Sequence, residues 1–450
     1  MGQKGQRTMK NKKMMVVGFI TAVGITLAFS TSLIAKSNAA SQSTEASLEA
    51  SRLQSLAKFT KVLSIVEQYN VDGLGIDQLV DKSLQGMLSN LDAHSTFMDK
   101  KSFESLKSQT DGEFGGLGIT VGMRDNTLTV IAPIEGTPAD KAGIKAGDII
   151  LKINDKATLS MNIDDAVGIM RGKPKTPIDI TIIRKGAPEP LKFHIVRDII
   201  TVESVYTRTI DDNILYIRIT SFDKKVAADV KTALLKHAAK SKGIILDLRN
   251  NPGGLLDQAV DLTDLFVDEG VIVSQKGRNK SDDVSYSATK KATICRLPLV
   301  VLVNEGSASA SEIVSGAMQD LKRGVIVGAT TFGKGSVQVV MPITDTEAIK
   351  LTIARYYLPS GRTIQAVGVV PDVEVDAGEI KKRENGFNIK EADLKKHLEG
   401  ELEKIDGMVD VTEANATNKT IITKEQLTKD IQLKEGVGII KALIIVKGNS

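Results

Sequence analysis

The sequence predicts a mixed α/β protein of several domains, and stretches of different character support this. Residues 200–375 alternate strand-like and helix-like segments, which is typical of a sheet covered by helices. Residues 113–197 contain short strands punctuated by glycines, which indicates a small β domain. Residues 41–108 and 377–450 are charged and largely helical in pattern. With 450 residues and 42% hydrophobic content, the chain can form two or three domains.

The N-terminus predicts an exported protein. Residues 1–39 carry six basic residues and no acidic residue, with an apolar stretch from Met14 to Phe29 and small residues up to Ala40. This is the pattern of a secretory signal peptide, and we favour cleavage after Ala39 or Ala40. Residues 14–35 are nearly long enough to span a bilayer, so an uncleaved inner-membrane anchor stays the alternative. Either form predicts a location in the cell envelope, in the periplasm or on the outer face of the cytoplasmic membrane.

Composition argues against several other classes of protein. The leader alone contributes six positive charges, so the net charge of +4 leaves the rest of the chain slightly acidic. Aromatic residues make up 4% of the chain and tryptophan is absent, so nucleic acid is not an expected partner. Cys295 is the single cysteine, which excludes a disulfide framework and a lipobox. No Cys/His cluster predicts a metal site, and no cofactor is expected.

The β domain at 113–197 contains a glycine loop, Gly116-Leu117-Gly118-Ile119, followed by a one-turn helix and glycine turn over Pro138–Asp148. Successive backbone N–H groups in such a loop form a nest for a carboxylate, and the adjoining strand edge can pair with an added peptide strand. The combination resembles a PDZ domain, whose loop binds the C-terminal carboxylate of a peptide. A structural barrel whose glycines only make turns is the alternative.

Residues 200–375 contain the elements of the predicted core. Runs such as Ile244-Ile245-Leu246 lack alternation, which predicts strands buried on both faces. Strands are predicted at 214–219, 243–248, 271–274, 299–304, 324–328, 337–342 and 348–356, and helices at 226–240, 255–265 and 311–321.

The stretch Asn304–Ile313 predicts a serine nucleophile. It places Ser307, Ser309 and Ser311 between an apolar strand and a helix, where free N–H groups of the helix N-terminus favour developing negative charge. Lys334 follows 25 residues after Ser309. The pair indicates a Ser/Lys hydrolase, although spacing alone leaves the choice among the three serines open.

Lys334 can act as a general base only if desolvation lowers its pKa from about 10.4 toward 7 or 8. No Asp or Glu lies between residues 324 and 344, so the local sequence offers no counter-ion. Gln338 lies four residues further in an extended segment, and we expect it on the same face, hydrogen-bonded to the lysine. A Ser–His–Asp triad is not predicted from the contexts of the four histidines, His94, His194, His237 and His397.

The predicted oxyanion hole needs two N–H donors aimed at one point. Ala310, directly after Ser309, offers one donor. Gly253 or Gly254 offers the other, because glycines after the buried strand ending at Leu248 allow close approach of a substrate. A plain turn at Asn251–Gly254 is the alternative.

Together these motifs resemble the carboxyl-terminal processing peptidases, also called tail-specific proteases. The likeness covers nearly the whole exported part, from Leu91-Asp92-Ala93-His94-Ser95 to Tyr357–Arg362, with Ala93 where the family often has proline. The resemblance implies Ser309 as nucleophile, Lys334 as base and Gln338 as the residue that orients it. It also implies a crotonase-like ββα spiral core at 198–376 with an inserted PDZ-like barrel, flanking helical segments, and a dimer built from those segments.

We therefore expect a serine endopeptidase that captures the C-termini of unfolded proteins at Gly116–Ile119 and cleaves them. Arg171, near the end of the PDZ-like module, is predicted to gate the site, and an adaptor protein is a further candidate partner. The apolar chain end Val437–Val446 is predicted to be buried in the homodimer, with a docked terminal helix or strand as the alternative. The rival functions are a catalytically silent PDZ scaffold and a crotonase-like acyl-CoA enzyme.

Overall fold

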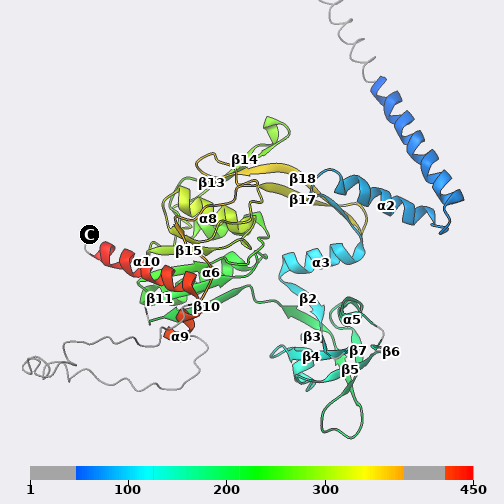
Figure 1. The fold of residues 1–450 in the computed structure, drawn as a ribbon, viewed down its shortest axis with the longest axis horizontal. Helices are drawn as coiled ribbons and strands as arrows, with labels where there is room; N and C mark the ends of the chain where they lie inside the picture. Colours follow the sequence, from blue (N-terminus) through cyan, green and yellow to red (C-terminus); the bar gives the residue numbers. More distant parts are fainter. Residues whose placement is uncertain (1–46, 125, 160, 212, 380–420, 449–450) are drawn as a thin grey trace, which may run out of the picture. The chain divides into compact units, whose positions relative to one another are not determined.

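The computed structural model describes residues 47–124, 126–159, 161–211, 213–379 and 421–448 (Figure 1). The predicted leader at 1–39 lies outside the described residues, as does much of the helical segment predicted at 377–450. In the described ranges, no helix combines the length and the apolar character needed to cross a membrane. The chain divides into two units, Met1–Ala93 and His94–Ser450.

The first unit is helical over its described residues. It contains a helix over 47–69 and α2 (Ile76–Ser89), joined by a turn at Gly73 with φ of +65°. The first helix leaves an apolar row exposed, formed by Leu53, Leu56, Phe59 and Val62. The predicted helical character of residues 41–108 is thus present, and it continues in the second unit as α3 (Lys100–Asp111).

The β domain forms one sheet in the order β3-β4-β5-β7-β8, with β6 paired to β5. Alternate residues of β7 face its core: Ile178, Ile180 and Ile182 are buried while Asp179 between them is exposed. The entering and leaving strands β2 and β9 pair antiparallel. The elements are β2 (Glu113–Gly116), β3 (Ile119–Arg124), β4 (Thr127–Pro133), α4 (Pro138–Lys141), β5 (Ile149–Ile153), β6 (Lys156–Ala157), α5 (Ile163–Met170), β7 (Pro177–Ile183), β8 (Leu191–Val196) and β9 (Asp198–Thr201).

The core contains a seven-stranded sheet in the order β19-β16-β15-β12-β11-β10-β20. Its pairs are parallel except β10 with β11. Ile244 and Leu246 pack into the layer with α6 (Val226–His237), α7 (Leu256–Asp264) and α8 (Ala310–Asp320), while Ile245 faces α10 (Ile431–Gly448). The predicted burial of both faces is therefore confirmed. The strands are β10 (Val205–Ile210), β11 (Ile214–Ile219), β12 (Gly243–Asp247), β15 (Leu299–Val303), β16 (Val325–Gly328), β19 (Val373–Glu374) and β20 (Ile421–Ile422).

A second core sheet has the order β1-β18-β13-β14, with β17 also paired to β18. It carries the residues that follow the predicted base. Its strands are β1 (Thr96–Met98), β13 (Val271–Gly277), β14 (Val284–Ser287), β17 (Ser336–Pro342) and β18 (Ala348–Tyr357). Short helices complete the described elements: η1 (Ala238–Lys240), η2 (Lys280–Asp282) and α9 (Lys424–Thr428).

The apolar chain end is docked on the molecule's own sheet, as Figure 1 shows for α10. Leu433, Val437 and Ile440 of α10 are buried against the face formed by β12 and β15. Ile445 and Val446, in the last described turn, are 65% and 67% exposed. The docked helix that we gave as the alternative is therefore present, and the dimer stays a prediction.

Candidate active site

Ser309 immediately precedes α8 in a backbone conformation that L-residues rarely adopt, with φ of +55° and ψ of −111°. Such a conformation costs on the order of 1–3 kcal/mol and persists only where the surrounding structure holds it. The residue is 8% exposed. It lies where the N–H groups of the first helical turn have no acceptor within the helix.

Hydrogen bonds distinguish Ser307, Ser309 and Ser311, which the spacing in the sequence did not. Ser307 Oγ donates to Leu248 O at 2.8 Å, and Ser311 Oγ donates to Asn251 O at 2.9 Å. Both residues are fully buried. The Ser309 hydroxyl donates to no acceptor in the part of the chain that the structure describes. Ser309 is therefore the one of the three whose proton is not committed to the scaffold.

A fully buried carboxylate, Glu312, joins the serine turn to the lysine loop. Its Oε2 accepts the backbone N–H of Ser309 at 2.8 Å and of Lys334 at 2.9 Å. Its Oε1 accepts the Gly333 N–H at 2.7 Å and the Thr331 hydroxyl at 2.6 Å. Because one oxygen holds both N–H groups, the backbones of the predicted nucleophile and base lie side by side.

The Lys334 side chain is half-buried, and its ammonium forms no ion pair among the described residues. Burial lowers the pKa of Lys334, the positive charge of Lys350 lowers it further, and the Glu312 carboxylate opposes both. Glu312 lies outside the stretch 324–344, in which the sequence offers no counter-ion. It binds the Lys334 main chain, and among the described residues the amine has no ion-pair partner.

Gln338 is hydrogen-bonded to residues other than the lysine. Lys334 lies in the loop before β17, so the alternation of an extended strand does not relate the two side chains. Gln338 Nε2 donates to Ser336 Oγ at 2.7 Å and to Thr352 Oγ1 at 3.3 Å. Within the described ranges, no hydrogen bond joins Gln338 to Lys334.

Gly253 packs directly against the serine turn. A Cβ on Gly253 would lie 2.7 Å from Ala308 O and 2.9 Å from Ala310 N, and its φ is +99°, so only glycine fits. The Gly253 N–H donates to Asn251 Oδ1 at 2.9 Å. The Phe222 main chain is hydrogen-bonded to the residues before and after Gly254. The Gly254 N–H itself has no backbone acceptor among the described residues.

The glycine loop of the β domain borders a small pocket. The loop and β3 form one side, and Val167 and Met170 of α5 form the other. Arg171 and Phe114 also line this pocket, with the guanidinium carbon 4.6 Å from the centre of the ring. The pocket thus places the predicted carboxylate loop, Gly116–Ile119, beside an apolar helix face.

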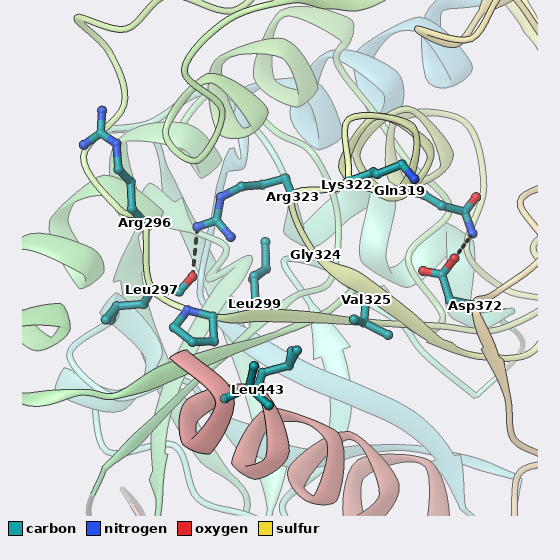
Figure 2. A pocket seen from close by; sticks show the side chains of 12 residues that line it. Arg296, Leu297, Leu299, Gln319, Lys322, Arg323, Gly324, Val325, Asp372 and Leu443 are labelled. Carbon is teal, nitrogen blue, oxygen red and sulfur yellow. Dashed lines mark hydrogen bonds between the residues drawn. The ribbon is translucent and has the colours of Figure 1, made fainter. Parts of the chain in front are cut away.

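A separate pocket beside α10 contains none of the predicted site residues (Figure 2). Leu297, Leu299, Val325 and Leu443 form much of its wall. Arg323 at its edge donates to Phe266 O at 2.7 Å and to Leu297 O at 3.0 Å, so this arginine ties loops together.

Sequence reasoning missed Glu312 and Asn251. Glu312 could have been found, because Ser309-Ala310-Ser311-Glu312 has the Ser-x-x-Glu spacing of a capping box, in which the acid accepts the N–H at the helix start. Nothing local marks Asn251, whose side chain is buried between Ile219 O and the Gly253 N–H. In the described residues, no group of three or more Asp, Glu, His or Cys is placed to hold a metal ion.

Comparison with known proteins shows which family the chain belongs to. The family model for peptidase family S41 matches residues 213–375, a PDZ domain model matches 129–184, and the model for the N-terminal domain of the activating protease CtpB matches 15–102. A carboxy-terminal-processing protease of Bartonella bacilliformis is 41% identical over 369 residues, which cover 80% of this chain and 85% of the relative. The chain belongs to the carboxy-terminal-processing protease family of S41 peptidases.

A second relative gives the same assignment. Carboxy-terminal processing protease CtpA of Bacillus subtilis is 38% identical over 332 residues, which cover 72% of this chain and 71% of the relative. Among solved structures, a photosystem II D1 C-terminal processing protease is 28% identical, with a TM-score of 0.42 over 71% of this chain and 92% of that chain. The family membership establishes a protease with a PDZ domain and a mixed α/β fold.

Proposed function

We propose that this protease is an exported serine endopeptidase that binds the C-termini of unfolded proteins and cleaves them with Ser309 as nucleophile and Lys334 as base. The observation that carries the proposal is the Glu312 carboxylate, whose Oε2 holds the N–H groups of both Ser309 and Lys334. The two reactive groups are the Ser309 hydroxyl, which donates to no acceptor among the described residues, and the Lys334 amine, whose pKa is lowered and which has no ion-pair partner there.

In the proposed reaction, the neutral Lys334 amine takes the Ser309 hydroxyl proton while Ser309 Oγ attacks the peptide carbonyl carbon. The carbonyl oxygen becomes an oxyanion, stabilised by the N–H groups of Ala310 and Gly254. Gly254 is preferred to Gly253 because the Gly253 N–H is already bonded to Asn251. The C–N bond then breaks as the amine leaving group takes the proton from Lys334. Water, deprotonated by Lys334, hydrolyses the acyl-enzyme and regenerates Ser309.

The PDZ domain is proposed to hold the substrate's C-terminal carboxylate on the N–H groups of Gly116–Ile119, with the last side chain in the pocket against Met170. Arg171 is proposed to transmit this binding. With Phe114 it lines a second pocket that also includes Ser204, Ser221 and Asp223, next to the core strands.

Arg171→Ala should reduce turnover of a substrate with a free C-terminus about fivefold or more, and leave an amidated substrate unaffected. Lys173→Ala, at a neighbouring residue, is the control. If the two variants cleaved the substrate with a free C-terminus equally fast, Arg171 would have no gating role.

Several further features belong to the proposal. They are a leader at 1–39 that is either cleaved or kept as an inner-membrane anchor, a periplasmic location or one on the outer face of the cytoplasmic membrane, a homodimer, an adaptor protein, and a crotonase-like ββα arrangement of the core. The leader's basic and apolar pattern supports export, and the exposed apolar rows of helix 47–69 and the end of α10 are consistent with a dimer.

The decisive test incubates the purified chain with a casein-like unfolded protein. We expect cleavage by the unmodified chain, and a loss of roughly 10⁴- to 10⁶-fold for Ser309→Ala and for Lys334→Ala. Ser311→Ala is the matched control, because it loses only the hydrogen bond to Asn251 O and should lower stability by about 1–3 kcal/mol while still cleaving. Cleavage that survives Ser309→Ala would contradict the assignment. Binding of C-terminal peptides without any cleavage would instead support the silent PDZ scaffold.

A further inference from the structure

The C-terminal segment, residues 421–446, contacts the strand that leads into the glycine loop of the active site. Arg249 lies two residues after the end of β12 and directly before Asn250–Gly254. Its side chain is 11% exposed, so the guanidinium is almost removed from water. Asp430 and Gln432, at the start of α10, approach it from the C-terminal segment.

The Arg249 guanidinium is held on both sides. Toward the core, its Nη2 donates to Asp247 Oδ2 at 2.7 Å and its Nε to Asp247 Oδ1 at 3.0 Å. Toward the C-terminal segment, Nη1 and Nη2 donate to the two oxygens of Asp430 at 2.8 and 2.7 Å. Nη1 also donates to Gln432 Oε1 at 3.2 Å. Such a two-point pair fixes the orientation of both groups.

Asp430 makes a second contact, within the start of α10. Its Oδ1 accepts the N–H of Leu433 at 2.9 Å, which caps the start of α10. Gln432 Nε2 donates to Val375 O at 2.8 Å, at the end of the core. The Arg249 contact is therefore formed only when α10 lies in its docked position.

From Arg249 the restraint continues along the chain to the active site. Asn250 follows with φ of +55°, and its N–H donates to Asn304 Oδ1 at 2.8 Å. Asn251 accepts the Gly253 N–H, and Gly253 packs on the serine turn. A shift of Arg249 would thus be transmitted through two adjoining residues to the glycines that face Ser309.

The charges around Arg249 predict that its side chain shifts when Asp430 is lost. Asp247 is fully buried and also accepts the Tyr216 hydroxyl at 2.7 Å, so one buried carboxylate remains to balance Arg249. Burial opposes the charge of Asp430, but the hydrogen bonds from Arg249 outweigh it and lower the pKa of Asp430. Breaking one side of a buried charge pair leaves the other charge uncompensated, and the side chain then moves toward water.

We propose that Asp430 is a positioning residue for catalysis, which sets the glycine loop of the oxyanion hole through Arg249. The inference rests on the proposed function, because it assigns that loop a role in the transition state. It makes docking of the C-terminal segment a condition for full turnover, so the protease reaches its full rate only when residues 421–446 are in place.

The test compares two full-length variants that each remove one contact of the C-terminal segment with the core. Asp430→Asn weakens the pair with Arg249. Lys441→Met removes the ion pair of Lys441 with Asp211, which lies near the end of β10 and away from the glycine loop. Both are assayed on a short chromogenic peptide, and rates are normalised to the folded fraction measured by near-ultraviolet circular dichroism.

We expect Asp430→Asn to lower kcat about 10- to 100-fold with little change in KM, because a misplaced oxyanion donor affects the transition state and not substrate binding. The affinity of a peptide aldehyde, whose adduct places an oxyanion in the hole, should fall by the same factor. Lys441→Met should change neither. Equal kcat in the two variants, or a rise in KM alone, would overturn the inference. An inactive unmodified chain, or an active Ser309→Ala variant, would instead contradict the proposed function.

Discussion

The serine turn and the lysine loop differ in how tightly the structure holds them. Around the turn, the hydroxyls of Ser307 and Ser311 and the side chain of Asn251 are fully buried and bonded to the main chain. The Lys334 side chain is half-buried, and its amine has no ionic partner in the described part of the chain. The backbone of the site is therefore restrained at many points, while among the described residues the Ser309 hydroxyl donates to no acceptor and the Lys334 amine has no ionic partner.

This difference has a physical reason. A serine nucleophile must be placed accurately, because a displacement of about 1 Å can cost on the order of 10²-fold in rate. A lysine base needs above all to be neutral, which requires burial without a carboxylate beside its amine. Glu312 meets the first need, because its carboxylate accepts three N–H groups and one hydroxyl around the site. The second need is met by burial and by Lys350, which lower the pKa of Lys334 against the opposing charge of Glu312.

The strongest test of this comparison replaces Glu312 by glutamine. The glutamine amide has one acceptor oxygen and one NH₂ group. The NH₂ group would therefore face N–H donors, which are either those of Ser309 and Lys334 or that of Gly333. We expect a loss of about 2–4 kcal/mol in the free energy of unfolding and a fall of about 10²- to 10³-fold in kcat. Urea unfolding and steady-state kinetics measure the two effects.

The control for this prediction is Asp148→Asn in the PDZ domain. Asp148 is a buried carboxylate that pairs with Arg184, so the change has a similar chemical nature at a site remote from Ser309. It should lower stability and leave cleavage of a short peptide, which does not need the PDZ domain, unchanged. If Glu312→Gln retained full kcat, Glu312 would be a structural residue with no part in aligning the site.

Much of the core could be predicted from the sequence because its strands are apolar runs. The segments predicted at 214–219, 299–304 and 337–342 agree with β11, β15 and β17 to within one residue at either end. β10 and β14 were not predicted. Their sequences alternate with polar residues, and their pairing depends on distant partners.

The site could be predicted less completely than the fold. Ser309 and Lys334 were named from motifs, and the structure brings their backbones to one oxygen atom. The contact of Asp430 with Arg249 joins residues far apart in the chain, and no pattern in the sequence indicates it. The hydrogen bond expected between Gln338 and Lys334 is not formed among the described residues, where Gln338 bonds to Ser336 and Thr352. Lys334 lies in the loop before β17, so strand alternation does not relate the two side chains, and the start of a strand is not fixed by one sequence.

The prediction with the smallest expected effect changes only a charge near Lys334. Lys350, in β18 next to β17, lowers the pKa of Lys334 by repulsion, so Lys350→Met should raise that pKa. Activity requires the neutral amine, and kcat/KM therefore increases as the pH rises through the pKa of Lys334. In the variant this increase should occur at higher pH, with about a two- to fivefold loss at pH 7 and full activity restored at alkaline pH.

A pH–rate profile at two salt concentrations measures this effect and separates charge from geometry. Salt screens charge repulsion, so the difference between variant and unmodified chain should shrink at high ionic strength. Lys231→Met, on the exposed face of α6, removes the same charge elsewhere and should leave the profile unchanged. A lower kcat at every pH would show that Lys350 shapes the site, whereas a shift toward lower pH would mean that Lys334 is not the base, since loss of a neighbouring cation can only favour the ammonium form.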